Sequence, residues 1–187
     1  MVTKERLITA EEFLLMEFED GKRYELVHGI LEEMPVSGEE ASAIGLWFGS
    51  LIVQFVQKNK LGHVTGADGG YMLDNNPDLV RYPDVGFVSF TKLPKRIPGF
   101  VPFAPELAVE VISPSDRPTK VHNKAKEYLH YGSKMVWILD PEDKTIEIYT
   151  PVDAENVNIR TLNINGTLDG GDVLPGFKVA VKDIFEW

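Results

Sequence analysis

The sequence predicts an α/β or α+β fold, with a central mixed β-sheet flanked by helices and β-hairpins towards the N- and C-terminal ends. Two apolar runs, residues 107–112 and 135–139, are typical of strands buried on both faces. A helical pattern over residues 119–131 separates the two runs. The order strand–helix–strand implies a right-handed crossover, so these two strands should be parallel neighbours.

Near the N-terminus, cap and turn residues predict a short helix followed by a hairpin. Thr9, followed three residues later by Glu12, has the pattern of a helix start, and a short amphipathic helix should follow it. Residues 23–34 are predicted to form two strands, with His28 and Gly29 at the turn between them.

The middle of the chain should contain a long core helix and two more strands. Residues 39–60 have an apolar face at helical spacing, and Gly62 is expected to end this helix. Strands are expected over residues 63–73 and 82–90, with a loop at 74–78 between them. The segment that follows, up to Pro105, has four prolines and should be a loop.

The C-terminal part favours further hairpin strands. Residues 145–150 should pair with 135–139, and strands are expected near 157–162 and 178–181. No repeat, low-complexity tract or linker marks a domain boundary. Residues 1–187 are therefore expected to form a single domain.

Composition narrows the classes of protein to consider. The chain has no cysteine, which excludes disulfides and thiolate metal sites and suits a reducing, cytoplasmic location. Its longest apolar segment, residues 44–56, is too short to span a bilayer, so a soluble protein is expected. The net charge of −10 lacks the basic footprint of a strong nucleic-acid binder, so contact with DNA should be weak, transient or assisted by a metal.

Two carboxylates stand out against apolar surroundings. Glu110 lies inside the first buried strand, where a charge is costly unless it is paired, neutralised or bound to a metal. Asp84 follows Pro83 at the entrance of another apolar strand. A buried salt bridge would explain Glu110, and a turn or cap would explain Asp84. Together, they could instead converge on a divalent cation, because Mg²⁺ is often held by one or two carboxylates plus waters.

The helix after Glu110 offers a cation to this site. Lys124 shares a helical stripe with Val121, Ala125 and Tyr128, and this stripe should face the sheet. Lys120, one turn earlier, is the second candidate. The lysine could simply extend to solvent. Alternatively, it could reach the two carboxylates, orient an attacking water and stabilise a charged transition state.

Several ordered motifs resemble the Uma2 family, abundant in bacteria and especially in cyanobacteria. The matching segments include Tyr24-Glu25-Leu-Val-x-Gly29, Tyr82-Pro83-Asp84-Val, Leu107-Ala-Val-Glu110-Val-Ile-Ser-Pro-Ser-Asp116, Lys124-x-x-x-Tyr128, Val136-Trp137-Ile-Leu-Asp140-Pro141 and Leu168-Asp-Gly-Gly-Asp-Val-Leu-Pro-Gly176-Phe177. The resemblance extends from about Tyr24 to Phe185. It implies a restriction-endonuclease-like fold of the PD-(D/E)xK superfamily.

The resemblance also implies roles for individual residues. Asp84 and Glu110 would be the two acidic motif residues and the ligands of Mg²⁺ or Mn²⁺. The superfamily lysine would fall at Ile112, and in this family it corresponds to Lys124 on the next helix. Glu25 would be an additional acidic residue near the N-terminus, although a strand residue paired with a neighbouring cation is the alternative.

The chain departs from many relatives at two positions. The relatives have an aspartate at the position of His28 and a histidine near the position of Ala41. The sequence nevertheless predicts a Mg²⁺-dependent endonuclease that hydrolyses DNA phosphodiester bonds, and a homodimer would supply two sites for two nicks. The alternatives are a noncatalytic binding module on a nuclease scaffold, or a phosphoesterase acting on a smaller substrate.

Overall fold

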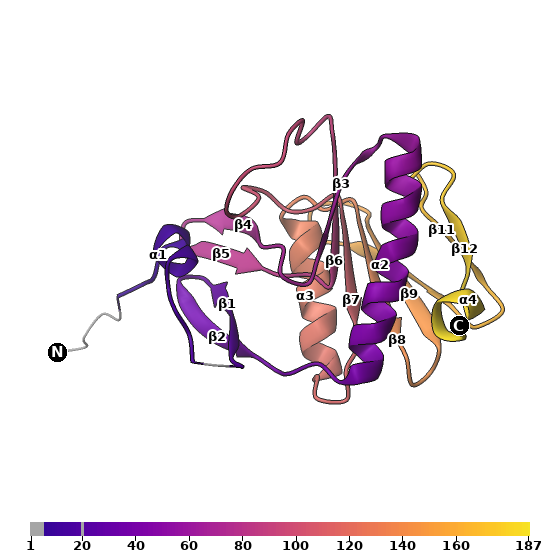
Figure 1. Ribbon diagram of the computed structural model, residues 1–187, viewed down its shortest axis with the longest axis horizontal. Helices are drawn as coiled ribbons and strands as arrows, with labels where there is room; N and C mark the ends of the chain where they lie inside the picture. The colour runs from indigo at the N-terminus through magenta and orange to yellow at the C-terminus, as the bar shows by residue number, and fades with distance from the viewer. Residues whose placement is uncertain (1–5, 20) are drawn as a thin grey trace.

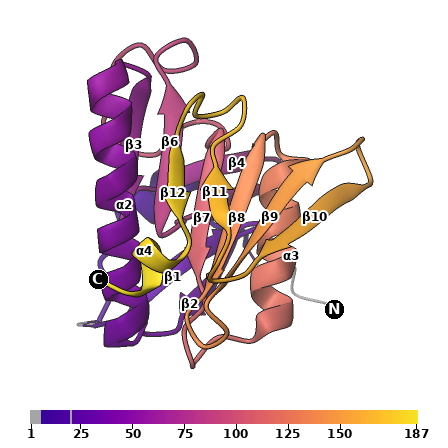
Figure 2. The same ribbon diagram turned by 90° about the vertical axis from the view of Figure 1, so that its right-hand side faces the viewer.

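Six strands form the central sheet of the computed structural model, which describes residues 6–19 and 21–187. Their order is β10-β9-β8-β7-β6-β3, and Figure 2 shows the sheet nearly face-on. The bounds are β3 (Gly62–Gly66), β6 (Val85–Ser89), β7 (Leu107–Val111), β8 (Met135–Asp140), β9 (Thr145–Pro151) and β10 (Val157–Leu162). The β7–β8 pair is parallel and the other neighbours are antiparallel, which confirms the predicted mixed sheet.

Two helices cover opposite faces of this sheet, as Figure 1 shows. Helix α2 (Glu39–Asn59) packs Phe48 and Ile52 against one face, in a core that includes Trp137. Helix α3 (Pro118–His130) packs its inward residues against Ala108 and Val136 on the other. Because side chains alternate along a strand, successive residues of β7 face different helices. This alternation decides which helix Glu110 meets.

A second sheet lies at the N-terminal end of the molecule. Its order is β2-β1-β5-β4, formed by β1 (Arg23–Val27), β2 (Ile30–Met34), β4 (Tyr71–Asn75) and β5 (Asp78–Arg81). Helix α1 (Ala10–Leu14) begins with the expected capping box of Thr9 and Glu12. The β1–β2 turn places His28 at φ 50° and Gly29 at φ 78°, the left-handed geometry that favours a two-residue hairpin turn.

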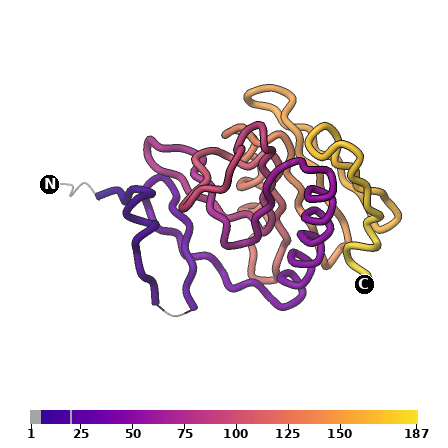
Figure 3. Tube along the Cα trace, turned by 45° about the horizontal axis from the view of Figure 1, so that its top comes forward, coloured from indigo at the N-terminus to yellow at the C-terminus, as the bar shows by residue number. Residues whose placement is uncertain are grey.

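The C-terminal residues form a small hairpin on the α2 side of the central sheet. It consists of β11 (Thr167–Asp169) and β12 (Lys178–Ala180), followed by α4 (Lys182–Phe185). The tube in Figure 3 places this hairpin and the N-terminal sheet at opposite ends of the molecule. The predicted fold class, with a hairpin towards each end, is therefore confirmed.

Three details of the prediction were wrong. The expected strands over 63–73 and 82–90 are four strands, β3 to β6, because residues 74–78 include the turn of the β4–β5 hairpin. Helix α2 ends earlier than Gly62: Lys60 takes the left-handed capping conformation at φ 53°. Gly62 instead begins β3, and β11 and α4 were not predicted. Over residues 6–19 and 21–187, no helix has the length and apolar character required to cross a membrane.

Candidate active site

Glu110 lies on the face of β7 that packs against α3. Ala108 and Glu110 point towards this helix, while Leu107, Val109 and Val111 contribute to the core on the α2 side. The residue is only 8% exposed, and its carboxylate is held by two groups from α3. The Tyr128 hydroxyl donates a hydrogen bond of 3.0 Å to Oε1 of Glu110, and Nζ of Lys124 lies 3.0 Å from the same oxygen.

Lys124 joins two carboxylates from different sheets. Its Nζ lies 2.8 Å from Oε1 of Glu25 on β1 and 3.0 Å from Oε1 of Glu110 on β7. The side chain is 13% exposed, so it does not extend freely into solvent. Lys120, the second candidate from the sequence, pairs instead with Glu32 at 2.8 Å and is largely exposed. Lys124 is thus the lysine whose ammonium group reaches Glu110.

Glu25 is fixed from the other side by a buried arginine. Nη1 of Arg81 lies 2.7 Å from Oε2 of Glu25, and Nε of Arg81 lies 2.6 Å from Oε2 of Glu127. The backbone N–H of Tyr82 donates a further hydrogen bond of 3.1 Å to Glu25. The pairing of Glu25 with a neighbouring cation matches the structural alternative raised from the sequence. The sequence did not predict a role for Arg81 at the site. Its position directly before Tyr82-Pro83-Asp84 was a signal that could have indicated one.

Asp84 reaches the same place from the start of β6. Its Oδ2 accepts a hydrogen bond of 2.7 Å from the backbone N–H of Val111, the residue after Glu110. This contact follows from the antiparallel register, in which Val85 stands opposite Val109, so the start of β6 lies beside the end of β7. The structure thus brings together Glu25, Asp84, Glu110 and Lys124, which come from four different elements.

These four residues line a small cavity of about 80 Å³ between the two sheets and α3. Glu32, Asp116 and Lys120 stand at other parts of its wall. Such a volume can hold several waters or a hydrated cation. Carboxylates clearly outnumber ammonium groups along this lining, so the cavity is electronegative. We refer to it as the acidic pocket.

The ionisation of the carboxylates reflects this imbalance. Burial by itself raises the pKa of Glu25, but Lys124 and Arg81 outweigh it and lower that pKa to about 2. For Glu110, burial dominates over the attraction of Lys124, and Asp84 and Glu25 add repulsion, so its pKa rises to about 7. Burial likewise raises the pKa of Asp84. The two cations therefore compensate Glu25 well, and they leave Asp84 and Glu110 short of positive charge.

This shortage fits a divalent cation at Asp84 and Glu110. Within the part of the chain that the structure describes, no cluster of three or more His, Cys, Asp or Glu side chains is arranged as a complete metal cage. Mg²⁺ does not require one, because it usually keeps several waters and binds one or two carboxylates. Oε2 of Glu110 has Lys124 as its one partner, at 3.3 Å, and so retains a free lone pair, whereas Oε1 is bonded to both Tyr128 and Lys124. Lys124–Glu110 is nevertheless an ion pair, as the structural interpretation of Glu110 expected.

The two positions that depart from many relatives lie apart from these contacts, as does Ile112 at the position of the superfamily lysine. Ile112 packs in the apolar cluster on the α3 side. His28 is exposed at the β1–β2 turn, and Ala41 is buried in the first turn of α2. Since Lys124 supplies an ammonium group to Glu110 from α3, a lysine at position 112 is not needed for that contact.

Comparisons with known proteins show the family and the fold of the chain. The sequence matches the Uma2 family model, described as "Putative restriction endonuclease", over residues 10–182. The fold is similar to the crystal structure of "a putative nuclease belonging to DUF820" from Anabaena variabilis ATCC 29413, with a TM-score of 0.79 and 22% identity over 96% of this chain and 98% of that one. A search of curated proteins found no match. The chain belongs to the Uma2 family.

Proposed function

We propose that the chain is a nuclease that hydrolyses DNA phosphodiester bonds at the acidic pocket with Mg²⁺ or Mn²⁺. One observation carries the proposal: Glu25, Asp84, Glu110 and Lys124 come from four elements and line one cavity, where positive charge compensates the two carboxylates with raised pKa only in part. The family description and the nuclease-like fold support the same class of reaction.

Asp84 and Glu110 would hold the metal ion. When bound, such an ion lowers the pKa of a water and polarises a phosphoryl oxygen. The hydrogen bond from Val111 N–H orients the Asp84 carboxylate, and the Tyr128 hydroxyl orients that of Glu110. Both carboxylates are therefore fixed by their own surroundings before any ligand arrives.

Lys124 would stabilise negative charge on the phosphate as the bond to the leaving oxygen breaks. Its pKa is raised, because Glu110 and Glu25 outweigh the opposing effect of burial, so the ammonium group stays protonated. Lys124 is thus suited to donate hydrogen bonds to a phosphate oxygen or an attacking water, and poorly suited to accept a proton. Glu25, held by Arg81, keeps this ammonium group in position.

A plasmid-nicking assay in Mg²⁺ or Mn²⁺ tests this assignment. Wild-type protein should nick the plasmid, and Asp84→Asn and Glu110→Gln should not. Glu106→Gln is the matched control, because Glu106 is also buried but pairs with Lys134 outside the acidic pocket. Equal activity in Glu110→Gln and wild type would sink the proposal.

A phosphoesterase acting on a smaller substrate is the second candidate, favoured by the acidity of the pocket and the net charge of −10. Hydrolysis of a small phosphodiester such as bis(p-nitrophenyl) phosphate, without nicking of DNA or RNA, would support it. A noncatalytic binding module is a further outcome. Calorimetry would indicate it if Mn²⁺ binding that depends on Asp84 and Glu110 is absent.

A further inference from the structure

A second pocket, of about 300 Å³, opens beside the acidic pocket. Its lining includes four aromatic residues that are only partly buried, and two cations. These residues are Phe18, Tyr24, Tyr82, Phe100, Lys22 and Arg23. We call this the aromatic pocket. It lies beside the N-terminal sheet and includes residues of the segment after α1.

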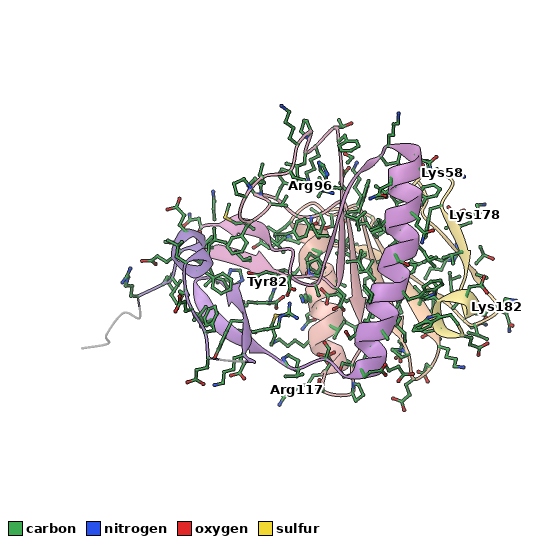
Figure 4. All side chains as sticks on the ribbon, in the orientation of Figure 1. Lys58, Tyr82, Arg96, Arg117, Lys178 and Lys182 are labelled. Carbon is green, nitrogen blue, oxygen red and sulfur yellow. The ribbon has the colours of Figure 1, made fainter. Side chains whose placement is uncertain are left out.

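Tyr82 lies where the two pockets adjoin. It lies two residues before Asp84, and its backbone N–H is bonded to Glu25. Tyr82 is a lining residue of both the acidic pocket and the aromatic pocket, as is Met34. Figure 4 shows Tyr82 in the region between the N-terminal sheet and α3. A group seated in the aromatic pocket would therefore lie next to any phosphate held at Asp84 and Glu110.

The aromatic rings are held in place by one another. The rings of Tyr82 and Phe100 meet edge to face, with centroids 6.1 Å apart, and Phe18 lies 4.6 Å from Tyr24. Phe13 is buried beneath them and stacks on Phe100 at 5.8 Å. Rings fixed in this way lose little conformational entropy when a flat ligand stacks on them. The aromatic rings thus form a preformed stacking surface within a pocket that also has charged residues in its lining.

The rim of this pocket carries an oriented guanidinium group. Nη2 of Arg23 donates a hydrogen bond of 2.6 Å to the carbonyl of Ala67 and lies 2.9 Å from Oδ1 of Asp68. Burial raises the pKa of Asp84, and the positive charge of Arg23 opposes this rise in part. Arg23 is therefore close enough to interact electrostatically with the acidic pocket. A planar aromatic site with a cation at its edge suits a nucleotide: a base for the rings and a phosphate for Arg23.

The negative net charge of the chain disfavours a long duplex as the ligand. Duplex binding depends mainly on neutralising backbone phosphates with Lys and Arg, whereas this chain has a net charge of −10. In Figure 4, Lys58, Lys178 and Lys182 lie on the side of α2 that is away from Tyr82, whereas Arg96 and Arg117 lie on the same side as Tyr82. Stacking on aromatic rings adds binding energy that does not come from phosphate contacts, but it requires a base whose face is free.

We propose that the aromatic pocket binds an unstacked nucleobase next to the scissile phosphate, so that single-stranded or locally unpaired DNA is the preferred substrate. This inference rests on the proposed nuclease function for its biological meaning. Binding of a nucleobase can, however, be measured without cleavage. A negative binding result can therefore be distinguished from a negative result for the nuclease function.

Fluorescence binding with 2-aminopurine oligonucleotides in EDTA is the test. The single strand should bind at least tenfold more tightly than the same sequence as a duplex, and stacking should quench 2-aminopurine emission. Tyr82→Leu should weaken binding by about 5- to 150-fold and remove the quenching, since one stacked base is worth that range. Tyr82→Phe keeps the ring and should retain both. Phe18→Leu, in the same pocket, should also weaken binding and covers the case in which Tyr82→Leu does not fold.

Trp187→Leu is the matched control, because Trp187 is a 62% exposed aromatic residue at the far, C-terminal end of the molecule. It should bind as wild type does. Equal affinity for duplex and single strand, or unchanged binding in both Tyr82→Leu and Phe18→Leu, would overturn the inference. Tyr82-dependent binding of the single strand without any nicking would support the inference and overturn the proposed nuclease function. Nicking of duplex without preference for unpaired DNA would do the reverse.

Discussion

Nη1 of Arg81 lies 2.7 Å from Oε2 of Glu25, and both side chains are less than a tenth exposed. A buried pair of this kind is costly to break, because removal of one partner leaves the other charge without compensation. The position of Lys124 depends on this pair, since Glu25 also contacts the ammonium group. Arg81 therefore stabilises both the N-terminal sheet and the acidic pocket.

Replacing Arg81 should destabilise the protein strongly. We expect Arg81→Met to lower the free energy of unfolding at pH 7 by about 3–5 kcal/mol, the range for a broken buried ion pair. Urea denaturation measures it. Arg23→Met is the control, because Arg23 is 46% exposed and its pair with Asp68 should contribute about 1 kcal/mol or less. A loss below about 1 kcal/mol in Arg81→Met would contradict the structural role given to Arg81.

Lys124 should be needed for the chemical step and not for metal binding. Lys124→Met should reduce the nicking rate by about 10²- to 10³-fold, the typical effect of removing one group that stabilises transition-state charge. Mn²⁺ affinity, measured by calorimetry, should stay the same or increase, because a cation beside Glu110 has been removed. Lys120→Met is the control: Lys120 lies one turn earlier and pairs with Glu32. If both variants nick equally well, Lys124 has no such role.

The stability of the metal-free protein should fall as pH rises from about 5 to 8. The pKa of Glu110 is raised by burial from 4.5 to about 7, so between these values the folded protein keeps a proton that the unfolded chain has released. Folding is then favoured on the acid side of this window and loses that contribution as pH rises through 7. Urea midpoints in EDTA should show this fall, and Glu110→Gln should reduce it.

Mn²⁺ binding should change the pH dependence of stability. A metal ion at Asp84 and Glu110 competes with the proton on Glu110, so it should raise the urea midpoint more at pH 8 than at pH 5.5. Glu110→Gln should lose most of this increase. A metal-free stability curve that is identical in wild type and Glu110→Gln across the window would show that Glu110 does not titrate there.

Local patterns were sufficient to predict most of the fold. The buried runs that became β7 and β8 and the periodic face of α2 are local signals, which explains why these elements were predicted well. The missed division of residues 63–90 into four strands depends on a chain reversal within a segment that looked like a loop. Nothing in the local sequence distinguishes such a reversal from a connection between distant strands.

The candidate site likewise contains residues that the sequence predicted and residues that it did not. Asp84, Glu110 and Lys124 were suggested by local placement and by the family resemblance. Arg81 could not be assigned a partner, because its contact with Glu25 depends on β1 pairing with β5, where Leu26 stands opposite Val80. Tyr128 was recognised only as part of an inward stripe. Its hydrogen bond to Glu110 depends on the angle between α3 and the sheet, which sequence periodicity does not contain.

Gly62 is confined by the strand with which β3 pairs, a contact that the local sequence does not contain. A Cβ at this position would lie 2.0 Å from the carbonyl oxygen of Val88, so β3 can pair with β6 only if residue 62 lacks a side chain. Gly62→Ala should destabilise the protein by about 1–3 kcal/mol or more, because backbone must move to relieve the overlap. Gly66→Ala is the matched control: it lies on the same strand, and a Cβ there meets nothing within 4 Å. Urea denaturation of both variants separates the two effects. Equal stability would mean that the close approach at Gly62, and with it the β3–β6 register, is wrong.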